Sequence, residues 1–495
     1  MSISPFLLLA GFTYICLFYG LSWRHPWLAL MLIFATSPLQ NDLSSGAAAK
    51  FSITEINLIL ALPLVVLRGR RFRMGPVALP VFLYFFVCLM AFVVSPRATT
   101  LSSMVQMVLY LVIAVAVFGS LPRRPRDLMP ALYALTWVGI FLAFLSLTQT
   151  YERLGLNKNG VGASLAVALV VCCELWFGAR TRKSKARLSL AFLLITIGLF
   201  MTLSRGAWLS AIVGLFVVCA VRRQFLLLGR VVALAIPVLV VGWMLLPQKS
   251  KTYMTGFDAA KHENIRLRYE SVNIANRNFE KNPLLGVGVG LRKEYDATNV
   301  AMLTLAETGI LGLGTFALIH LVVIGTAWQM QRRLKRDDPL FPFVALGGAL
   351  LISRLAHGMV DHYWTRGAIT TAWASVGMLT YVYFALRRRR RTERFVRRAF
   401  AQRLQSLRHS RIRQPALPLG GQAQGATFNV TAPSAPISAV QTATAPAATA
   451  PTATAPSSTR LAADARVLRN GAADFRSSNS IPPSKPRSSS SEDTL

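Results

Sequence analysis

Acidic residues, histidines and cysteines are all scarce in this chain of 495 residues. It has 20 Asp and Glu against 54 Lys and Arg, only six His, and five cysteines. The cysteines lie inside apolar stretches, without the spacing of metal ligands and in places poorly suited to extracellular disulfides: Cys16, Cys88, Cys172, Cys173 and Cys219. We interpret them as small apolar packing residues, and we expect neither a metal nor another cofactor.

Long apolar runs dominate what the chain does contain. Hydrophobic residues make up 53% of it, and runs of about 20 such residues recur from Pro5 to Leu386. About 20 residues cross a bilayer core of roughly 30 Å, which predicts an all-α polytopic membrane protein with about 12–13 transmembrane helices. The expected spans lie near 5–22, 26–40, 53–67, 76–95, 103–120, 129–148, 160–178, 188–203, 206–221, 225–246, 301–327, 341–357 and 367–386.

The net charge of +34 is concentrated in short segments beside these spans. The basic segments are Arg68–Arg73, Arg123–Arg126, Arg180–Arg187, Arg222–Arg223, Arg332–Arg336 and Arg387–Arg413. They alternate with less basic connections near 41–52, 96–102, 149–159, 204–205, 247–300 and 358–366. This is the positive-inside pattern. It predicts a multi-pass protein with its N-terminus on the outer side, in the periplasm or exterior, and its C-terminus in the cytoplasm. Without a recognition module, the charge does not indicate nucleic-acid binding.

The same pattern divides the chain into four parts. Residues 1–150 form N-terminal transmembrane helices, and residues 151–386 form a second transmembrane region that includes a long periplasmic loop at 247–300. Residues 387–413 form a basic juxtamembrane segment, expected on anionic lipid headgroups. Residues 414–495, rich in Ala, Pro, Thr and Ser, are expected to be a disordered tail because they cannot build a core.

Two groups of arginines fall on the outward side. Arg205 lies in a tight turn between two spans, where a charge is costly unless it is paired or hydrated; the alternative is an arginine that reaches to the headgroups. Arg266 and Arg268 lie in the loop, in an expected amphipathic helix on the membrane surface. Because they are two residues apart they point to different faces, so one can enter a site. An Arg–Glu surface pair is the alternative.

Two further outward clusters are candidates. In Gly286-Val287-Gly288-Val289-Gly290 no strand precedes the glycines, which argues against a nucleotide loop. They can let backbone amides approach a ligand or a neighbouring helix. Arg354, His357 and Asp361 share one helical face and can position a base and a counter-charge. A structural polar network is the main alternative. A metal pair is less favoured, because three ligands at an established spacing are not visible. The latter cluster continues into His362, Trp364 and Arg366, and a further outward cation stands on another turn at Lys158.

Together these clusters place several guanidiniums and an imidazole at the outer membrane face. Guanidiniums pair bidentately with phosphates, so a diphosphate on a lipid carrier at headgroup level would suit such a site. Glycosyl transfer from that carrier needs stabilisation of the departing diphosphate and a base for the acceptor hydroxyl.

At these residues the chain resembles the O-antigen ligase and polymerase superfamily of bacterial envelopes. The shared patterns are S-R-G-A at Ser204–Ala207, an arginine in the loop helix at Arg268, P-L-x-G-x-G at Pro283–Gly288, and a final segment at Asn299–Gly312. The turn Lys158–Gly162 is similar to the K-N-x-x-G of exopolysaccharide-production polymerases. The resemblance covers roughly Leu154 to Tyr383.

The resemblance implies metal-independent transfer from undecaprenyl diphosphate, with Arg205 and Arg268 holding the diphosphate. The family histidine, proposed to activate the acceptor in ligases, falls on Thr298 here; His357 or His262 could replace it. Because polymerases vary more at this position, we expect a polymerase that joins undecaprenyl-diphosphate-linked oligosaccharide repeat units into exopolysaccharide or O-antigen. An O-antigen ligase acting on lipid A core or another acceptor is the first alternative, followed by a transporter or flippase of lipid-linked sugars and an inactive scaffold.

The expected catalytic residues are Arg205, Arg268, His357 and Asp361, and the expected substrate-binding residues are Lys158, Arg266, Glu307, Arg354, Gly286 and Gly288. The expected partners are the lipid-linked oligosaccharide and membrane lipids, with polysaccharide export or chain-length proteins as further candidates.

Overall fold

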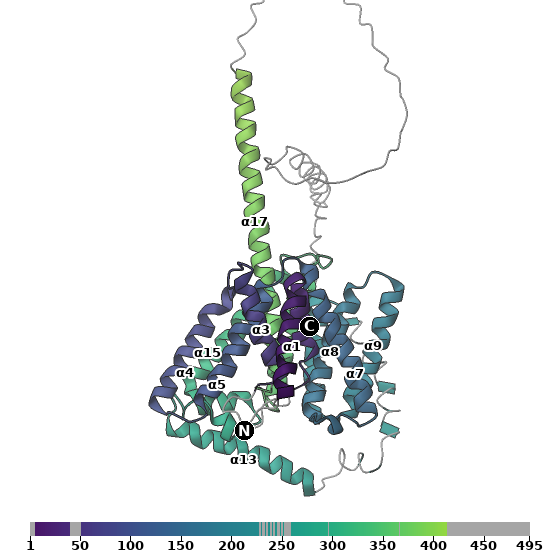
Figure 1. Cartoon of the computed structure of the whole chain (residues 1–495), viewed down its shortest axis with the longest axis vertical. Coiled ribbons are helices and arrows are strands. Elements are labelled where there is room, and N and C mark those ends of the chain that lie inside the picture. The colour runs from purple at the N-terminus through teal and green to yellow at the C-terminus, as the bar shows by residue number, and fades with distance from the viewer. Residues whose placement is uncertain are drawn as a thin grey trace, which may run out of the picture. The chain divides into compact units, whose positions relative to one another are not determined.

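The computed structural model describes residues 5–39, 51–226, 259–295, 297–365 and 367–412, together with isolated positions between 229 and 251. Throughout these ranges the regular elements are helices and no strand occurs, which confirms the all-α prediction (Figure 1). The chain divides into two units, Met1–Gln414 and Pro415–Leu495. The second unit, which holds almost all of the expected disordered tail, lies outside the described residues.

The helices are α1 (Pro5–Arg24), α2 (Pro26–Ala35), α3 (Ile53–Leu67), α4 (Ala78–Val94), α5 (Thr100–Met107), α6 (Val115–Ser120), α7 (Met129–Leu147), α8 (Lys158–Gly178), α9 (Arg182–Met201), α10 (Arg205–Arg222), α13 (Ala259–Lys281), α14 (Leu291–Glu294), α15 (Val300–Gln331), α16 (Phe341–Gly358) and α17 (Ala368–Ile412). A π-helical segment at Val108–Ala114 joins α5 to α6 into one continuous element.

Among the described residues, nine helices are long and apolar enough to cross a membrane, and each coincides with an expected span. The expected spans at 26–40 and 53–67 appear as shorter apolar helices, α2 with 10 residues and α3 with 15. The expected span at 225–246 lies largely outside the described residues. The chain is therefore a multi-pass membrane protein, as the apolar runs predicted.

The basic connections gather at one end of the bundle, here called the basic end. One cavity is lined by arginines from three different connections, Arg126, Arg180 and Arg336, and by Arg222 at the end of α10. Arg389 of α17 lies 2.7 Å from Asp338 beside this cavity. The pKa of Arg70 is lowered, first by burial and then by the guanidiniums of Arg123 and Arg388. The segments that carry Arg70, Arg123 and Arg388 are therefore close neighbours too. The alternation of basic and less basic connections thus corresponds to two ends in space.

The less basic connections meet at the opposite end, here called the loop end. Arg97 forms a 2.6 Å ion pair with Glu294 of α14, which joins the connection after α4 to the long loop. Asn299 caps the start of α15 and donates a hydrogen bond to the carbonyl of Met359 over 3.1 Å. Helix α13 packs against α15 and runs along this end, as Figure 1 shows. The expected loop helix is therefore present.

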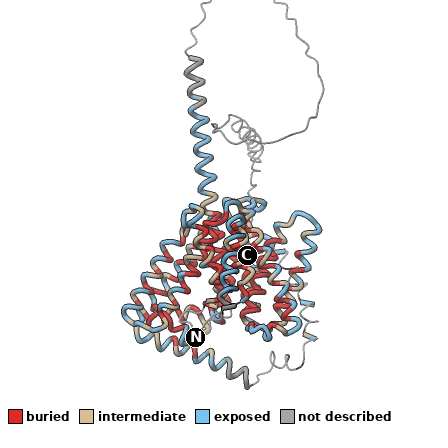
Figure 2. Tube along the Cα trace, in the orientation of Figure 1, coloured by how far each residue is buried: buried red, intermediate tan, exposed pale blue. Residues whose placement is uncertain are grey.

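Helix α17 passes from the bundle into the basic segment without a break. Its first part, from Ala368 to Val382, is almost entirely buried, whereas the side chains from Arg387 onward that the structure describes are exposed (Figure 2). The change follows composition, because apolar residues give way to arginines at this point. The expected juxtamembrane segment is thus a continuation of the last span.

The segment Gly286–Gly290, here called the glycine segment, follows α13 and fits into a break in α15. Gly309 has φ of +64° and ψ of −165°, so α15 is interrupted there. The backbone of the glycine segment fills the gap: the amides of Val287 and Gly288 donate to the carbonyls of Ala306 and Glu307 over 2.8 and 3.1 Å. The glycines therefore permit close approach to a neighbouring helix, which was one of the two roles expected.

Gly288→Ala is expected to lower the free energy of unfolding by about 2–4 kcal/mol. Gly288 has φ of +96°, and a Cβ there would lie 2.1 Å from the carbonyl oxygen of Ser95, so both the backbone and the contact would be strained. The matched control is Gly314→Ala in α15, where nothing lies within 4 Å and alanine favours the helix. Unfolding of both variants in detergent measures the difference; equal stability would contradict the prediction.

Candidate functional site

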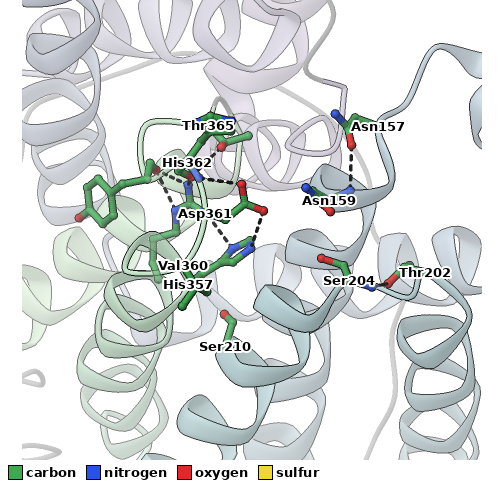
Figure 3. A network of polar contacts seen from close by, with 12 residues as sticks. Asn157, Asn159, Thr202, Ser204, Ser210, His357, Val360, Asp361, His362 and Thr365 are labelled. Atoms are coloured by element: carbon green, nitrogen blue, oxygen red, sulfur yellow. Dashed lines mark hydrogen bonds and ion pairs between the residues drawn. The ribbon is translucent and has the colours of Figure 1, made fainter. Parts of the chain in front are cut away.

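The end of α16 and the turn after it form a closely connected polar cluster. Arg354 and His357 lie one turn apart near the C-terminus of α16, and both are buried. The guanidinium of Arg354 donates to Nδ1 of His357 over 2.9 Å and to the carbonyls of His362 and Tyr363. Arg354 thereby holds the turn against the helix. As a result Asp361 comes back over the imidazole, with its Oδ2 3.7 Å from Nε2 of His357 (Figure 3).

The contact with Arg354 decides the protonation state of His357. A guanidinium can only donate hydrogen bonds, so Nδ1 of His357 is the acceptor and carries no proton. The neutral ring then keeps its proton on Nε2, the atom that faces Asp361. Within the described part of the chain this buried Nε2 has no hydrogen-bond partner. At 3.7 Å its N–H is too far from Asp361 for a hydrogen bond but still interacts electrostatically with the carboxylate. His357 is therefore a neutral donor directed towards Asp361.

Asp361 is the group in this cluster that can accept a proton. It is 6% exposed, and its Oδ1 accepts a hydrogen bond from the backbone N–H of His362 over 2.8 Å. Burial by itself raises the pKa of this carboxyl, but the interactions with His357 and with the His362 amide outweigh burial and lower the pKa from 3.8 to about 2. The carboxylate is thus ionised at neutral pH.

The first turn of α10 lies directly against the imidazole. A Cβ added to Gly206 would be 2.9 Å from Cδ2 of His357, so only glycine allows this approach. Deeper in the bundle, the hydroxyls of Ser210 and Ser353 are 2.8 Å apart and fix α10 against α16. Arg205 begins α10, and its side chain is exposed without an ion pair or hydrogen bond among the described residues. Its guanidinium is therefore available to an anion beside the cluster.

The loop helix and α15 reach the same turn from the other side. Nη1 of Arg268 in α13 donates to the carbonyl of Val360 over 2.5 Å. Asn299, directly after Thr298, holds the carbonyl of Met359. The backbone carbonyls of the two residues before Asp361 are therefore held by hydrogen bonds from α13 and from the residue that caps α15. Elements far apart in the sequence thus converge on one short turn.

The start of α8 completes this neighbourhood. A Cβ on Gly162 would lie 2.9 Å from Cβ of Ala207 and 3.1 Å from Cβ of Ser204, so α8 and α10 begin side by side. Lys158 is the first residue of α8, after the cap Asn157. Figure 3 shows Asn159 and Ser204 facing the cluster of His357 and Asp361 across the site. Lys158 therefore stands at the same end of the bundle as Arg205.

Three of the expected binding residues lie in the glycine segment and its break in α15. Glu307 is buried, and its Oε1 accepts the amides of Gly290 and Arg292 over 3.0 Å each. Gly286 and Gly288 are buried, and their amides donate to Asn282 and Glu307. The geometry supports a role in holding the loop rather than contact with substrate. Binding by these three residues stays a prediction.

Some expected residues are not placed in the cluster. Arg266 is exposed on α13. Arg366 and the side chain of His262 lie outside the described residues. In the described residues there is no group of three or more His, Cys, Asp or Glu that could hold a metal ion.

Arg292 links two parts of the site, and the sequence patterns did not indicate this role. It is 8% exposed, its Nη2 donates to the carbonyl of Ser103 over 2.9 Å, and its guanidinium lies 4.5 Å from the ring centre of Trp364. It thus joins the glycine segment to the turn that carries Asp361. The sequence did contain one signal for this role: Arg292 is a basic residue two positions after Gly290, in a connection on the outward side, where basic residues are few.

Comparison with known proteins gives one family. Residues 190–317 match the family model described as O-antigen ligase, a range that includes Arg205, Arg268 and the glycine segment but ends before α16. No curated protein matches the chain. The match indicates a function of the O-antigen ligase or polymerase type, with lipid-linked glycan as the substrate class. Residues 190–317 are therefore similar to the O-antigen ligase family, which supports the resemblance of this chain to the O-antigen ligase and polymerase superfamily.

Proposed function

We propose that the protein is a metal-independent polymerase of the bacterial inner membrane, which joins undecaprenyl-diphosphate-linked oligosaccharide repeat units at the loop end of its bundle. The loop end would face the periplasm, because the basic end would face the cytoplasm. One observation carries the proposal: α10, α13, α15 and α16 all converge on the turn that presents Asp361. This convergence supplies cations for a diphosphate and a carboxylate for a hydroxyl.

The chemistry is the exchange of one bond at the anomeric carbon of the donor sugar. The bond to the diphosphate oxygen breaks, and its electron pair leaves with the diphosphate. The hydroxyl oxygen of the acceptor unit forms the new glycosidic bond, and its proton passes to the carboxylate of Asp361. Arg205 and Arg268 stabilise the charge on the departing diphosphate. His357 and Arg354 act as positioning residues, because they hold Asp361 ionised and in place.

The residue before Asn299 bears on the choice between polymerase and ligase. Asn299 holds the turn at Met359, so Thr298 stands next to the site where the family pattern has a histidine. A threonine hydroxyl does not titrate near neutral pH and cannot replace an imidazole base. In this proposal the base is Asp361 instead. A ligase that transfers glycan to lipid A core or another acceptor is the second candidate, favoured by the description of the matched family.

The test is a reaction with purified protein in lipid vesicles and a native undecaprenyl-diphosphate repeat unit, with the products separated by size. A ladder of longer glycans on the lipid supports the polymerase. Transfer of a single glycan to a supplied lipid A core supports the ligase. Absence of both products with the correct substrate would refute the proposal.

Arg268→Ala is expected to reduce the rate of chain growth about 100-fold, since it removes a diphosphate contact and one of the two fastenings of the turn before Asp361. The matched control is Arg277→Ala, which removes an exposed arginine from the same helix, two and a half turns further on. The control should keep the wild-type rate. Equal losses in both variants would indicate that α13 contributes only general positive charge.

A further inference from the structure

A second candidate binding site lies at the basic end, away from the turn that carries Asp361. It is a cavity of about 520 Å³, formed where the connections after α6, α8, α10 and α15 meet. This volume is within the range of small-molecule sites. Its lining combines the arginines Arg126, Arg180 and Arg336 with the apolar side chains of Met129, Tyr133 and Phe177. The proposed polymerase reaction makes no use of this cavity.

The inner wall of the cavity is a satisfied ion pair. Arg222 of α10 binds both carboxylate oxygens of Glu174 in α8, and the two side chains are buried. The remaining Nη1 of Arg222 donates to the carbonyl of Arg336 over 2.8 Å, and its guanidinium stacks 4.5 Å from the ring centre of Phe341. This pair therefore shapes the cavity and brings the backbone at Arg336 into its wall, but it adds no net charge.

The outer wall has an excess of positive charge. Asp338 is already bound to Arg389. The one other carboxylate of this outer wall is Asp337, and it is outnumbered by three guanidiniums, those of Arg126, Arg180 and Arg336. None of these three forms an ion pair within the described part of the chain. Guanidiniums from three separate connections can surround one anion and bind a phosphate through paired N–H groups. The chemistry of the cavity thus fits a phosphate group.

The apolar part of the lining indicates how such a group is presented. Tyr133 of α7 lines the cavity and is 42% exposed, and Trp137, one turn further along α7, is 69% exposed. Aromatic side chains of this kind are typical of the membrane interface, and basic pockets between transmembrane helices bind lipid headgroups. We propose that this cavity at the basic end binds a phosphate-bearing anion. Because the rim of the cavity is aromatic, the anion is the headgroup of an anionic phospholipid rather than a soluble phosphate.

The test compares two double variants of the full-length protein in a neutral detergent, with binding measured by native mass spectrometry. R180Q/R336Q removes two guanidiniums from the cavity. R182Q/R333Q removes two exposed arginines from the same two connections, and these residues do not line the cavity. The two variants lose the same charge. The probes are phosphatidylglycerol, phosphatidylcholine as the uncharged lipid, and inorganic phosphate.

The wild type and R182Q/R333Q should bind phosphatidylglycerol in preference to phosphatidylcholine. R180Q/R336Q should bind it about 25-fold more weakly, because each basic contact to an anionic headgroup contributes about 1 kcal/mol, a factor of about five. Inorganic phosphate that binds with the same dependence on Arg180 and Arg336 would support the site and assign it to a soluble phosphate. Equal weakening in both variants, or no preference for either phosphate-bearing anion, would overturn the proposal. None of these results depends on polymerase activity.

Discussion

Asp361→Asn is expected to lower the rate of chain growth about 1,000-fold, within the range that a positioned general base contributes. Asparagine keeps the size of the side chain and can still accept the N–H of His362, but it cannot take a proton from the acceptor hydroxyl. Glu270→Gln, which removes an exposed carboxylate from α13 at the same end, is the matched control and should keep the wild-type rate. If Asp361→Asn keeps more than about a tenth of the activity, Asp361 is not the base.

The pH dependence separates this role from a purely structural one. Because the pKa of Asp361 is lowered to about 2, the carboxylate stays ionised above about pH 4, and the wild-type rate should show no loss from this group between pH 4 and neutrality. The lowered pKa also stabilises the fold above the ordinary value of 3.8, and this stabilisation is lost as the pH falls through about 2. A wild-type rate that fell with a midpoint near pH 6 would assign the base to another group.

Arg205→Ala is expected to lower the rate of chain growth about 100- to 1,000-fold, as measured for other groups that stabilise charge in a transition state. Arg205 is exposed without a partner among the described residues, so its removal should leave the melting temperature unchanged. A lysine at this position should restore part of the rate, because it keeps the charge but loses the bidentate geometry.

The control for Arg205 is Arg153→Ala, an exposed arginine in the connection before α8 at the same end of the bundle. It should lose less than about twofold, since an exposed charge away from the substrate contributes little. If Arg205→Ala and Arg153→Ala behave alike, the arginine of the S-R-G-A pattern does not bind the diphosphate. If Arg205→Ala unfolds the protein, the exposed arginine has a structural role instead.

The arginine and histidine positions of the cluster could be predicted from the sequence, but their roles could not. The spacing of Arg354, His357 and Asp361 predicted one face of a helix. The structure brings these three together, but α16 ends at Gly358 and Asp361 lies in the turn after it. Spacing does not say which nitrogen of His357 accepts a hydrogen bond. Only the contact with Arg354 shows that the ring is neutral and directed towards the carboxylate, and our proposal of Asp361 as the proton acceptor rests on that contact.

For the glycine segment, the sequence predicted the role of the residues but not their partner. The sequence indicated that Gly286 and Gly288 allow a close approach, and left open whether to a ligand or to a helix. The approach is to α15, at a break that begins where Gly309 takes a positive φ. A glycine in a long apolar run does not by itself mark a break, because helices tolerate single glycines. The glycine segment, about twenty residues earlier in the chain, fills this break.

The sequence by itself determined the class of this protein, the nine spans that the described residues contain and the sorting of its connections into two sets. Those properties depend on local quantities, namely the length of apolar runs and the number of lysines and arginines beside them. The tertiary structure decided which polar residues meet. Arg268, Asn299 and Gly206 lie far apart in the chain and approach the turn at Asp361 only through the packing of α13, α15 and α10. The same holds for Arg126, Arg180 and Arg336 at the basic end, because contacts between distant segments are fixed by packing and not by local sequence.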